Sequence, residues 1–297
     1  MPKANANGIQ IEYETFGDSS HSALLLIIGL GAQLIFWQEE FCQQIADAGY
    51  YVIRFDNRDS GLSTKFGGLT AEEILEKIEA LFMGQKVSVP YKMEDMANDA
   101  VGLLDALKID KAHICGMSMG GMIAQTLVVS TSSRALSLIS IYSQCGDRPE
   151  YAATQEVMEV MMKPVPKEHD AYIDYMHKFY RLTWGTGLPY DHDFHQILID
   201  KAYERSVYPE GSGRQYLAIK TQKDRTDDLG NLRIPSLVIH GDEDPVVPLI
   251  AGQDTADAIP GAEFMVVKGM GHVMPNLNTY WSEIKDTIIG HMGKVQA

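Results

Sequence analysis

The sequence predicts an α/β protein with a doubly wound, mostly parallel sheet and an inserted helical cap. Short apolar runs alternate with helical patterns along residues 23–143 and again along residues 235–292, as expected of βαβ units. Between these regions, from about Gly146 to Asp228, the pattern is helical and no buried-strand run occurs. We therefore expect a core domain at residues 1–145 and 229–297 and a cap domain at 146–228.

Strands are expected where apolar residues alternate with polar ones or run unbroken. Ile9–Phe16 alternates, as a half-exposed edge strand does, whereas Ala23–Ile28 is an unbroken run typical of a strand buried on both faces. Further expected strands are the run from Ala112, Tyr51–Phe55, Ala135–Ser143, Pro235–His240 and Ala262–Val267. Expected helices are Glu39–Ala48, Leu69–Gly84, Met93–Leu107, Gly121–Val129, Leu249–Ala258 and Trp281–Met292. The amphipathic helix Leu69–Gly84 is interpreted as a surface addition to a long crossover.

Composition limits the classes of partner. The chain has 297 residues, 45% of them hydrophobic, and a formal net charge of −15, which argues against nucleic acid or an anionic membrane surface. Three cysteines without metal-type spacing suit a reducing compartment and free thiols. No secretory signal pattern and no membrane-length apolar run are found, so a cytoplasmic location is expected. The expected oligomeric state is a monomer or a homodimer.

One motif dominates the chain. Gly116-Met-Ser118-Met-Gly120 stands between an apolar run and a helical pattern, so Ser118 falls at a sharp strand-to-helix turn that projects its hydroxyl outward. The flanking glycines leave room where a side chain would clash. Ser118 is the candidate nucleophile.

A serine hydroxyl needs a general base and a group that orients that base. His272 follows the last expected strand in a glycine-flanked loop, and Asp244 precedes Pro245 in the loop after the preceding strand, which gives the chain order Ser, Asp, His. Asp242 is the alternative acid, though it is better suited to bracing its loop. The main-chain N–H groups of Leu30 and Met119 are the candidate donors for a developing oxyanion.

The other histidines carry less weight. His240 ends an apolar strand and is interpreted as a packed residue. His192 and His195 resemble a metal pair, but two ligands are weak evidence, so neither a metal nor a cofactor is expected.

Together these motifs resemble the α/β-hydrolase fold family over essentially the whole chain. Two residues depart from the family pattern. Many members have histidine where Ile28 stands, so the support of the oxyanion loop must differ, and glycine is commoner where Asp59 stands. With these two departures and with Trp37, the sequence resembles the branch that includes anthracycline methylesterases and serine macrolide esterases. The resemblance implies a helical cap above the sheet. Large cap residues that could line a substrate pocket, together with Trp37, are Met158, Met162, Tyr175, Phe179 and Trp184.

The function expected from these features is serine-dependent hydrolysis of a bulky, largely apolar ester or lactone through an acyl-enzyme. A macrolide lactone, and with it antibiotic resistance, is the narrower hypothesis, and a polyketide methyl ester is its neighbour. Two alternatives remain open: a carbon–carbon bond hydrolase of aromatic breakdown, whose elbow has the same Gly-x-Ser-Met-Gly-Gly form, and a non-catalytic ligand receptor on the same scaffold.

Overall fold

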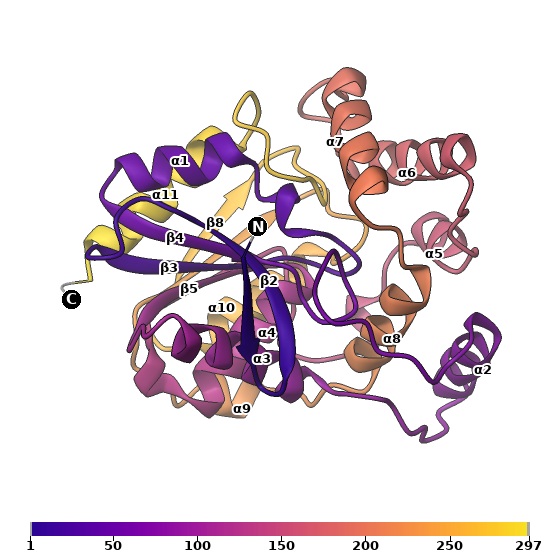
Figure 1. Ribbon diagram of the computed structural model, residues 1–297, viewed down its shortest axis with the longest axis horizontal. Coiled ribbons are helices and arrows are strands. Elements are labelled where there is room, and N and C mark those ends of the chain that lie inside the picture. Colours follow the sequence, from indigo (N-terminus) through magenta and orange to yellow (C-terminus); the bar gives the residue numbers. More distant parts are fainter. Residues whose placement is uncertain (1, 296–297) are drawn as a thin grey trace.

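The computed structural model describes residues 2–295, which form one sheet with helices on both faces (Figure 1). The sheet has eight strands in the order β1-β2-β4-β3-β5-β6-β7-β8. Strands β1 and β2 are antiparallel, and β2 is antiparallel to β4, whereas every later pairing is parallel. The strands are β1 (Lys3–Ala6), β2 (Ile9–Phe16), β3 (Ser22–Ile27), β4 (Tyr50–Phe55), β5 (Ala112–Met117), β6 (Ala135–Ile141), β7 (Ser236–Gly241) and β8 (Glu263–Val267). The doubly wound sheet predicted from the sequence is thus confirmed.

One detail of the sheet differs from the prediction. Strand β1 pairs with β2 and forms the sheet edge, so β2 is an inner strand. Burial along β2 does not follow the alternation of Ile9–Phe16, because the adjacent residues Ile11 and Glu12, on opposite faces, are both buried.

Helices cover the sheet in two layers (Figure 1). Helices α1 and α11 pack on one face, while α3, α4 and α10 pack on the other. The α-helices are α1 (Glu39–Asp47), α2 (Ala71–Phe82), α3 (Met93–Ala106), α4 (Met119–Ser130), α5 (Gln155–Met161), α6 (His169–Thr183), α7 (His192–Arg205), α8 (Pro209–Lys220), α9 (Thr226–Leu229), α10 (Leu249–Ala258) and α11 (Trp281–Gly293). Short 3₁₀ helices are η1 (Leu34–Phe36), η2 (Ser132–Arg134) and η3 (Pro149–Tyr151).

Four of the helices inserted after β6, α5 to α8, lie beyond the carboxyl ends of the parallel strands (Figure 1) and are called the cap below. Helix α5 packs on α6, and α6 on α7. Helix α9, which falls within the expected cap range, instead contacts α4 and α10. The parallel strands therefore direct their loops toward the helices α5 to α8, where open α/β sheets place their sites.

Helix α2 is not a surface addition. It packs along α8, and its buried residues Ile74 and Ile78 form a small apolar cluster with Leu217 of that helix. Amphipathic periodicity predicted the helix, but the surface that its apolar face covers lies more than a hundred residues away in the sequence.

No helix within residues 2–295 is both long and apolar enough to cross a bilayer. All three cysteines are buried free thiols, and burial raises the pKa of Cys42 to about 12.

Candidate active site

Ser118 lies on the turn between β5 and α4 with φ +54° and ψ −125°, a backbone conformation that non-glycine residues rarely adopt. The surrounding glycines are sterically required: a Cβ on Gly116 would lie 2.0 Å from the Gly120 carbonyl oxygen, and one on Gly120 would lie 2.1 Å from that of Ile27. The Ser118 N–H donates to the Ile141 carbonyl at 2.9 Å. The strained turn is thereby fixed at the carboxyl edge of the sheet.

Asp244 and His272 form a buried pair in the loops after β7 and β8. His272 Nδ1 lies 2.7 Å from Asp244 Oδ2, while Asp244 Oδ1 accepts the N–H groups of Val246 and Val247 at 2.8 and 2.9 Å. A carboxylate that already accepts two backbone donors is an acceptor for the imidazole as well, which assigns the proton of a neutral His272 to Nδ1. Nε2 is then the ring nitrogen with a lone pair for accepting a proton.

Tyr142 connects the serine turn to the histidine loop. Its ring centroid lies 4.4 Å from that of His272, and its hydroxyl lies 2.9 Å from Met117 Sδ and 3.2 Å from the Val273 carbonyl oxygen. Burial raises the pKa of Tyr142 well above its usual value, so the phenol stays neutral. Met117 and Val273 are the immediate neighbours of Ser118 and His272, so Tyr142 packs between their two loops. The sequence offered no motif that singled it out.

The remaining acids and histidines take other positions. Asp242 Oδ1 accepts the Gly269 N–H at 2.6 Å and so braces the histidine loop. His240 is buried, with Nε2 2.8 Å from the Val247 carbonyl, and burial lowers its pKa. His195 stacks on Tyr190 inside the cap. Within the described chain, no group of three or more His, Cys, Asp or Glu side chains is placed to hold a metal ion.

The loop after β3, residues 28–33, is the predicted oxyanion loop, and it approaches the serine closely. A Cβ on Gly29 would lie 3.3 Å from Ser118 Cβ and 3.7 Å from its Oγ. Two other N–H groups of this loop are occupied, because Gly31 donates to Gln215 at 2.8 Å and Ala32 to Gly29 at 3.4 Å. Leu30 directly precedes Gly31, and Met119 is the first residue of α4, whose N–H has no intrahelical acceptor.

The segment after α6 holds the histidine loop from the cap side. His272 N–H donates to the Thr183 carbonyl at 2.7 Å, Gly271 N–H to Trp184 at 3.1 Å, and Gly187 N–H to Gly269 at 3.0 Å. Close approach requires glycine here, since a Cβ on Gly271 would lie 2.1 Å from the Thr183 oxygen. Sequence reasoning treated this segment only as cap and missed the contact.

A cavity of about 400 Å³ begins at the oxyanion loop and extends into the cap. Among the residues expected to line a pocket, Met162, Tyr175 and Phe179 line this cavity. Its other walls include residues of the loop after β3, η1, α2, α5, α6, α8 with the residue before it, and the loop after β8: Leu30, Gly31, Phe36, Ala71, Ile74, Leu75, Ile78, Met161, Tyr172, Met176, Tyr180, Tyr208, Tyr216 and Met274. The lining is largely aromatic and aliphatic, as in sites for apolar ligands.

Three residues expected in the pocket lie elsewhere in the described structure. Trp37 is fully buried in the core, 5.5 Å from the Phe41 ring and 5.8 Å from that of Trp281. Trp184 is buried within the cap and donates its indole N–H to the Leu188 carbonyl. Met158 is half-buried on α5 and does not line the cavity. Large side chains at helical spacing do not reveal whether they face a core or a cavity.

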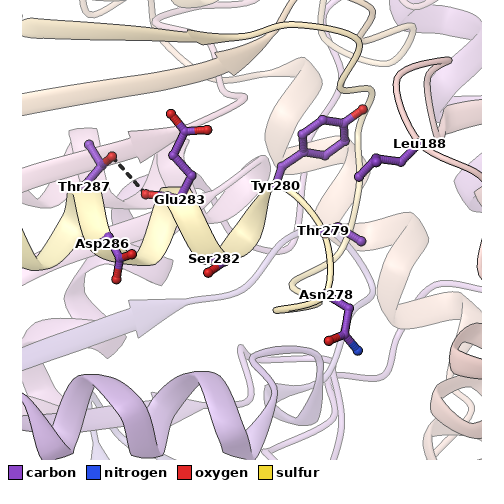
Figure 2. A pocket seen from close by; sticks show the side chains of 8 residues that line it. All are labelled: Leu188, Asn278, Thr279, Tyr280, Ser282, Glu283, Asp286 and Thr287. Atoms are coloured by element: carbon purple, nitrogen blue, oxygen red, sulfur yellow. Dashed lines mark hydrogen bonds between the residues drawn. The ribbon is translucent and has the colours of Figure 1, made fainter.

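A second hollow, of about 650 Å³, lies at the start of α11 (Figure 2). Its walls carry Tyr280 and the carboxylates of Glu283 and Asp286, and Thr287 donates to the Glu283 carbonyl. Asn278, Ser282, Glu283 and Asp286 are exposed, and none of the residues that line it belongs to the loop after β3, which lines the 400 Å³ cavity; Ser118 and His272 line neither of the two. It is a polar surface depression despite its volume.

Comparison with known proteins agrees with this architecture. Rhodomycin D methylesterase DauP of Streptomyces sp. is 28% identical over 284 residues, covering 88% of each chain. The 3-oxoadipate enol-lactonase 2 of Acinetobacter baylyi is 27% identical over 256 residues, covering 84% of this chain and 81% of its own. Among solved structures, the meta-cleavage product hydrolase CumD of Pseudomonas fluorescens superposes with a TM-score of 0.75 at 19% identity, covering 100% of this chain and 98% of its own.

A family model describing the alpha/beta hydrolase fold matches residues 22–174 and 198–275, which include Ser118, Asp244 and His272. The match spans most of the chain and includes the serine turn and the loops after β7 and β8. The chain belongs to the α/β-hydrolase fold family.

Proposed function

We propose that the protein is a serine ester hydrolase acting on bulky, largely apolar esters or lactones. The observation that carries the proposal is the buried Asp244–His272 pair, joined at 2.7 Å, on a loop that Tyr142 connects to the strained serine turn. Two curated relatives, named as a methylesterase and an enol-lactonase, support ester chemistry.

In the proposed reaction, Ser118 Oγ attacks the ester carbonyl carbon and its proton passes to His272 Nε2. Asp244 stabilises the imidazolium that forms, and the N–H groups of Leu30 and Met119 stabilise the charge on the carbonyl oxygen. His272 returns the proton to the departing alcohol, which leaves an acyl-enzyme. Water, deprotonated by His272, then attacks the acyl carbon and releases the acid and Ser118.

The cavity supports the substrate class. Aromatic and aliphatic side chains dominate its walls, and Leu30, which carries the proposed oxyanion donor, is among the lining residues. A polyketide methyl ester and a macrolide lactone are the two substrates that we propose within this class. The methylesterase relative favours the first.

The test is mass spectrometry of a substrate panel after incubation with wild type and variants. The panel contains short acyl esters, anthracycline methyl esters, macrolides of two ring sizes and a dienol-dione. Loss of one methylene mass identifies methyl-ester cleavage, and gain of one water mass identifies lactone opening. Ser118→Ala should abolish either product. Asp244→Asn should lower kcat by about 10³-fold to 10⁴-fold, since the imidazole would lose its oriented tautomer.

Asp242→Asn is the matched control, because an asparagine oxygen still accepts the Gly269 N–H. Its kcat should fall far less than that of Asp244→Asn. Full activity of Ser118→Ala would overturn the proposal. Cleavage of the dienol-dione with every ester intact would assign carbon–carbon hydrolysis instead, the chemistry that shares this elbow sequence. Tight binding without any product would assign a ligand receptor.

A further inference from the structure

We propose that Gln215, on cap helix α8, is a positioning residue for the oxyanion loop. On this reading the cap helps to build the catalytic apparatus, in addition to covering the substrate. The inference rests on the proposed ester hydrolysis for its kinetic consequence, but its structural part is tested independently below.

Gln215 is fully buried and both ends of its amide are used. Its Oε1 accepts the Gly31 N–H at 2.8 Å, and its Nε2 donates to the Arg58 carbonyl at 2.7 Å. Since one contact needs an acceptor and the other a donor, the amide orientation is determined. Gly31 directly follows Leu30, so the hydrogen bond fixes the loop one residue from the proposed oxyanion donor.

Helix α8 lies unusually close to this loop. Gly31 has φ +65°, and a Cβ there would lie 2.5 Å from Ser212 Oγ on α8. On the helix side, a Cβ on Gly211 would lie 2.2 Å from the Asp59 carbonyl oxygen. Glycines on both sides thus permit backbone contact between cap and core.

The neighbour of Gln215 fixes the rotation of α8. Arg214 Nε lies 2.9 Å from Asp59 Oδ2, and its Nη2 lies 3.0 Å from Oδ1, which is a two-point pairing. Both side chains are buried, and Asp59 also accepts from the Tyr91 hydroxyl and the Phe66 N–H, each at 2.7 Å. A paired arginine of this geometry holds the helix at one angle.

On the core side, the oxyanion loop is supported at different atoms. Asn57 Nδ2 donates to the Ile28 carbonyl at 2.9 Å, and the Leu34 N–H donates to Asp56 Oδ1 at 2.7 Å. Ser60 Oγ also donates to the Ala32 carbonyl, so the core holds Ile28, Ala32 and Leu34, whereas Gln215 holds the Gly31 N–H. Removing Gln215 should therefore release the Gly29–Gly31 turn while leaving its ends in place.

Gln215→Met is the main test, because methionine has a similar length and neither hydrogen-bonding group. Loss of a whole oxyanion donor costs about 10²-fold to 10³-fold in kcat, so displacement of one should cost about 10-fold to 100-fold, with KM little changed. Gln196→Met is the matched control: Gln196 is half-buried on α7, both ends of its amide are also hydrogen-bonded, and it does not line the cavity. It should change neither constant.

Gln215→Glu provides a second variant. Burial favours its neutral acid, which can accept from Gly31 and donate to Arg58 as glutamine does, so it should retain more kcat than Gln215→Met. Hydrogen–deuterium exchange of the peptide spanning residues 28–34 is the readout that needs no substrate. Exchange should accelerate in Gln215→Met and stay as in wild type in Gln196→Met.

Unchanged exchange over residues 28–34 would overturn the positioning role. Equal kcat in Gln215→Met and Gln196→Met would also overturn it, since a loss that the control shares indicates general destabilisation of the cap. If wild type hydrolyses no ester, the proposed function fails, and the exchange measurement alone decides whether Gln215 orders the loop.

Discussion

Four consecutive residues after β4, Asp56 to Asp59, each direct a buried side chain to a different neighbour. The partners are the Leu34 N–H and Arg205 for Asp56, the Ile28 carbonyl for Asn57, Asp99 for Arg58, and Arg214 for Asp59. Two of these contacts reach the oxyanion loop or its flank, and two reach the cap. The departure from glycine at Asp59 therefore has a structural reason, because its carboxylate anchors α8.

At the residue scale, His195 is expected to make the protein sensitive to acid. It lies among aromatic rings with Nδ1 2.6 Å from the Asp191 carbonyl, and burial lowers its pKa from 6.5 to about 4, with His177 and His192 contributing in the same direction. The unfolded chain binds the proton below about pH 6.5 and the folded chain only near pH 4. Stability is therefore lost as the pH falls through that window.

His195→Phe should remove this sensitivity while preserving the stacking. Between pH 7 and pH 5, wild type should lose about 2 kcal/mol more of its free energy of unfolding than the variant does. Urea denaturation at both pH values measures the difference. The same loss in the two proteins would show that His195 is not the group responsible.

At the element scale, α2 forms one wall of the 400 Å³ cavity in which we propose that substrate binds. Ala71, Ile74, Leu75 and Ile78 line it, and a Cβ on Gly213 of α8 would lie 2.8 Å from Ile74, so the two helices are in close contact. A segment of the core crossover thus contributes to the same cavity as the cap.

Leu75→Trp should narrow the cavity from this side. Because the larger ring occupies space that a bulky acyl or alcohol group would need, kcat/KM should fall about 10-fold or more for bulky esters and change little for acetyl esters. Glu76→Trp is the matched control, since Glu76 is exposed on the same helix and does not line the cavity. Parallel losses for small and bulky esters would contradict a role of α2 in selectivity.

At the scale of the whole molecule, buried ionic contacts join cap and core. Arg214 of α8 pairs with Asp59, and Arg205 of α7 pairs with Asp56 at 2.7 Å, both at nearly full burial. Burial of a charge is costly unless it is paired, so these contacts penalise separation of the two parts. We expect the cap side that carries α7 and α8 to stay docked.

Asp59→Asn should lower the free energy of unfolding by about 3–5 kcal/mol, because Arg214 is left buried without its counter-charge. Asp59→Asn combined with Arg214→Met should recover part of that loss. Glu210→Gln is the control: it removes the partner of the exposed Lys167 and should cost about 1 kcal/mol or less. Denaturant titration compares the four proteins, and equal losses in the two single variants would argue against the buried pair as the anchor.

Sequence patterns predicted seven of the eight strands, all but β1, together with helices α1, α2, α3, α4, α10 and α11 and the three residues of the proposed triad. Period-2 and unbroken apolar runs report strands, and the steric demands of the elbow require glycine at Gly116 and Gly120, so both signals are local. The pairing of Asp244 with His272 followed from their chain order, because parallel strands bring their terminal loops to one edge.

Tertiary structure alone decided which side chains face the cavity and which support the site. Trp37 and Trp184 are apolar and large, as expected of pocket residues, yet they pack in the core and within the cap. Gln215, Tyr142 and the Thr183–Gly187 segment support the site through contacts with residues distant in the chain. Local sequence determines periodicity and turn chemistry. Whether a side chain faces the core, the cavity or the site depends on which distant element packs against it.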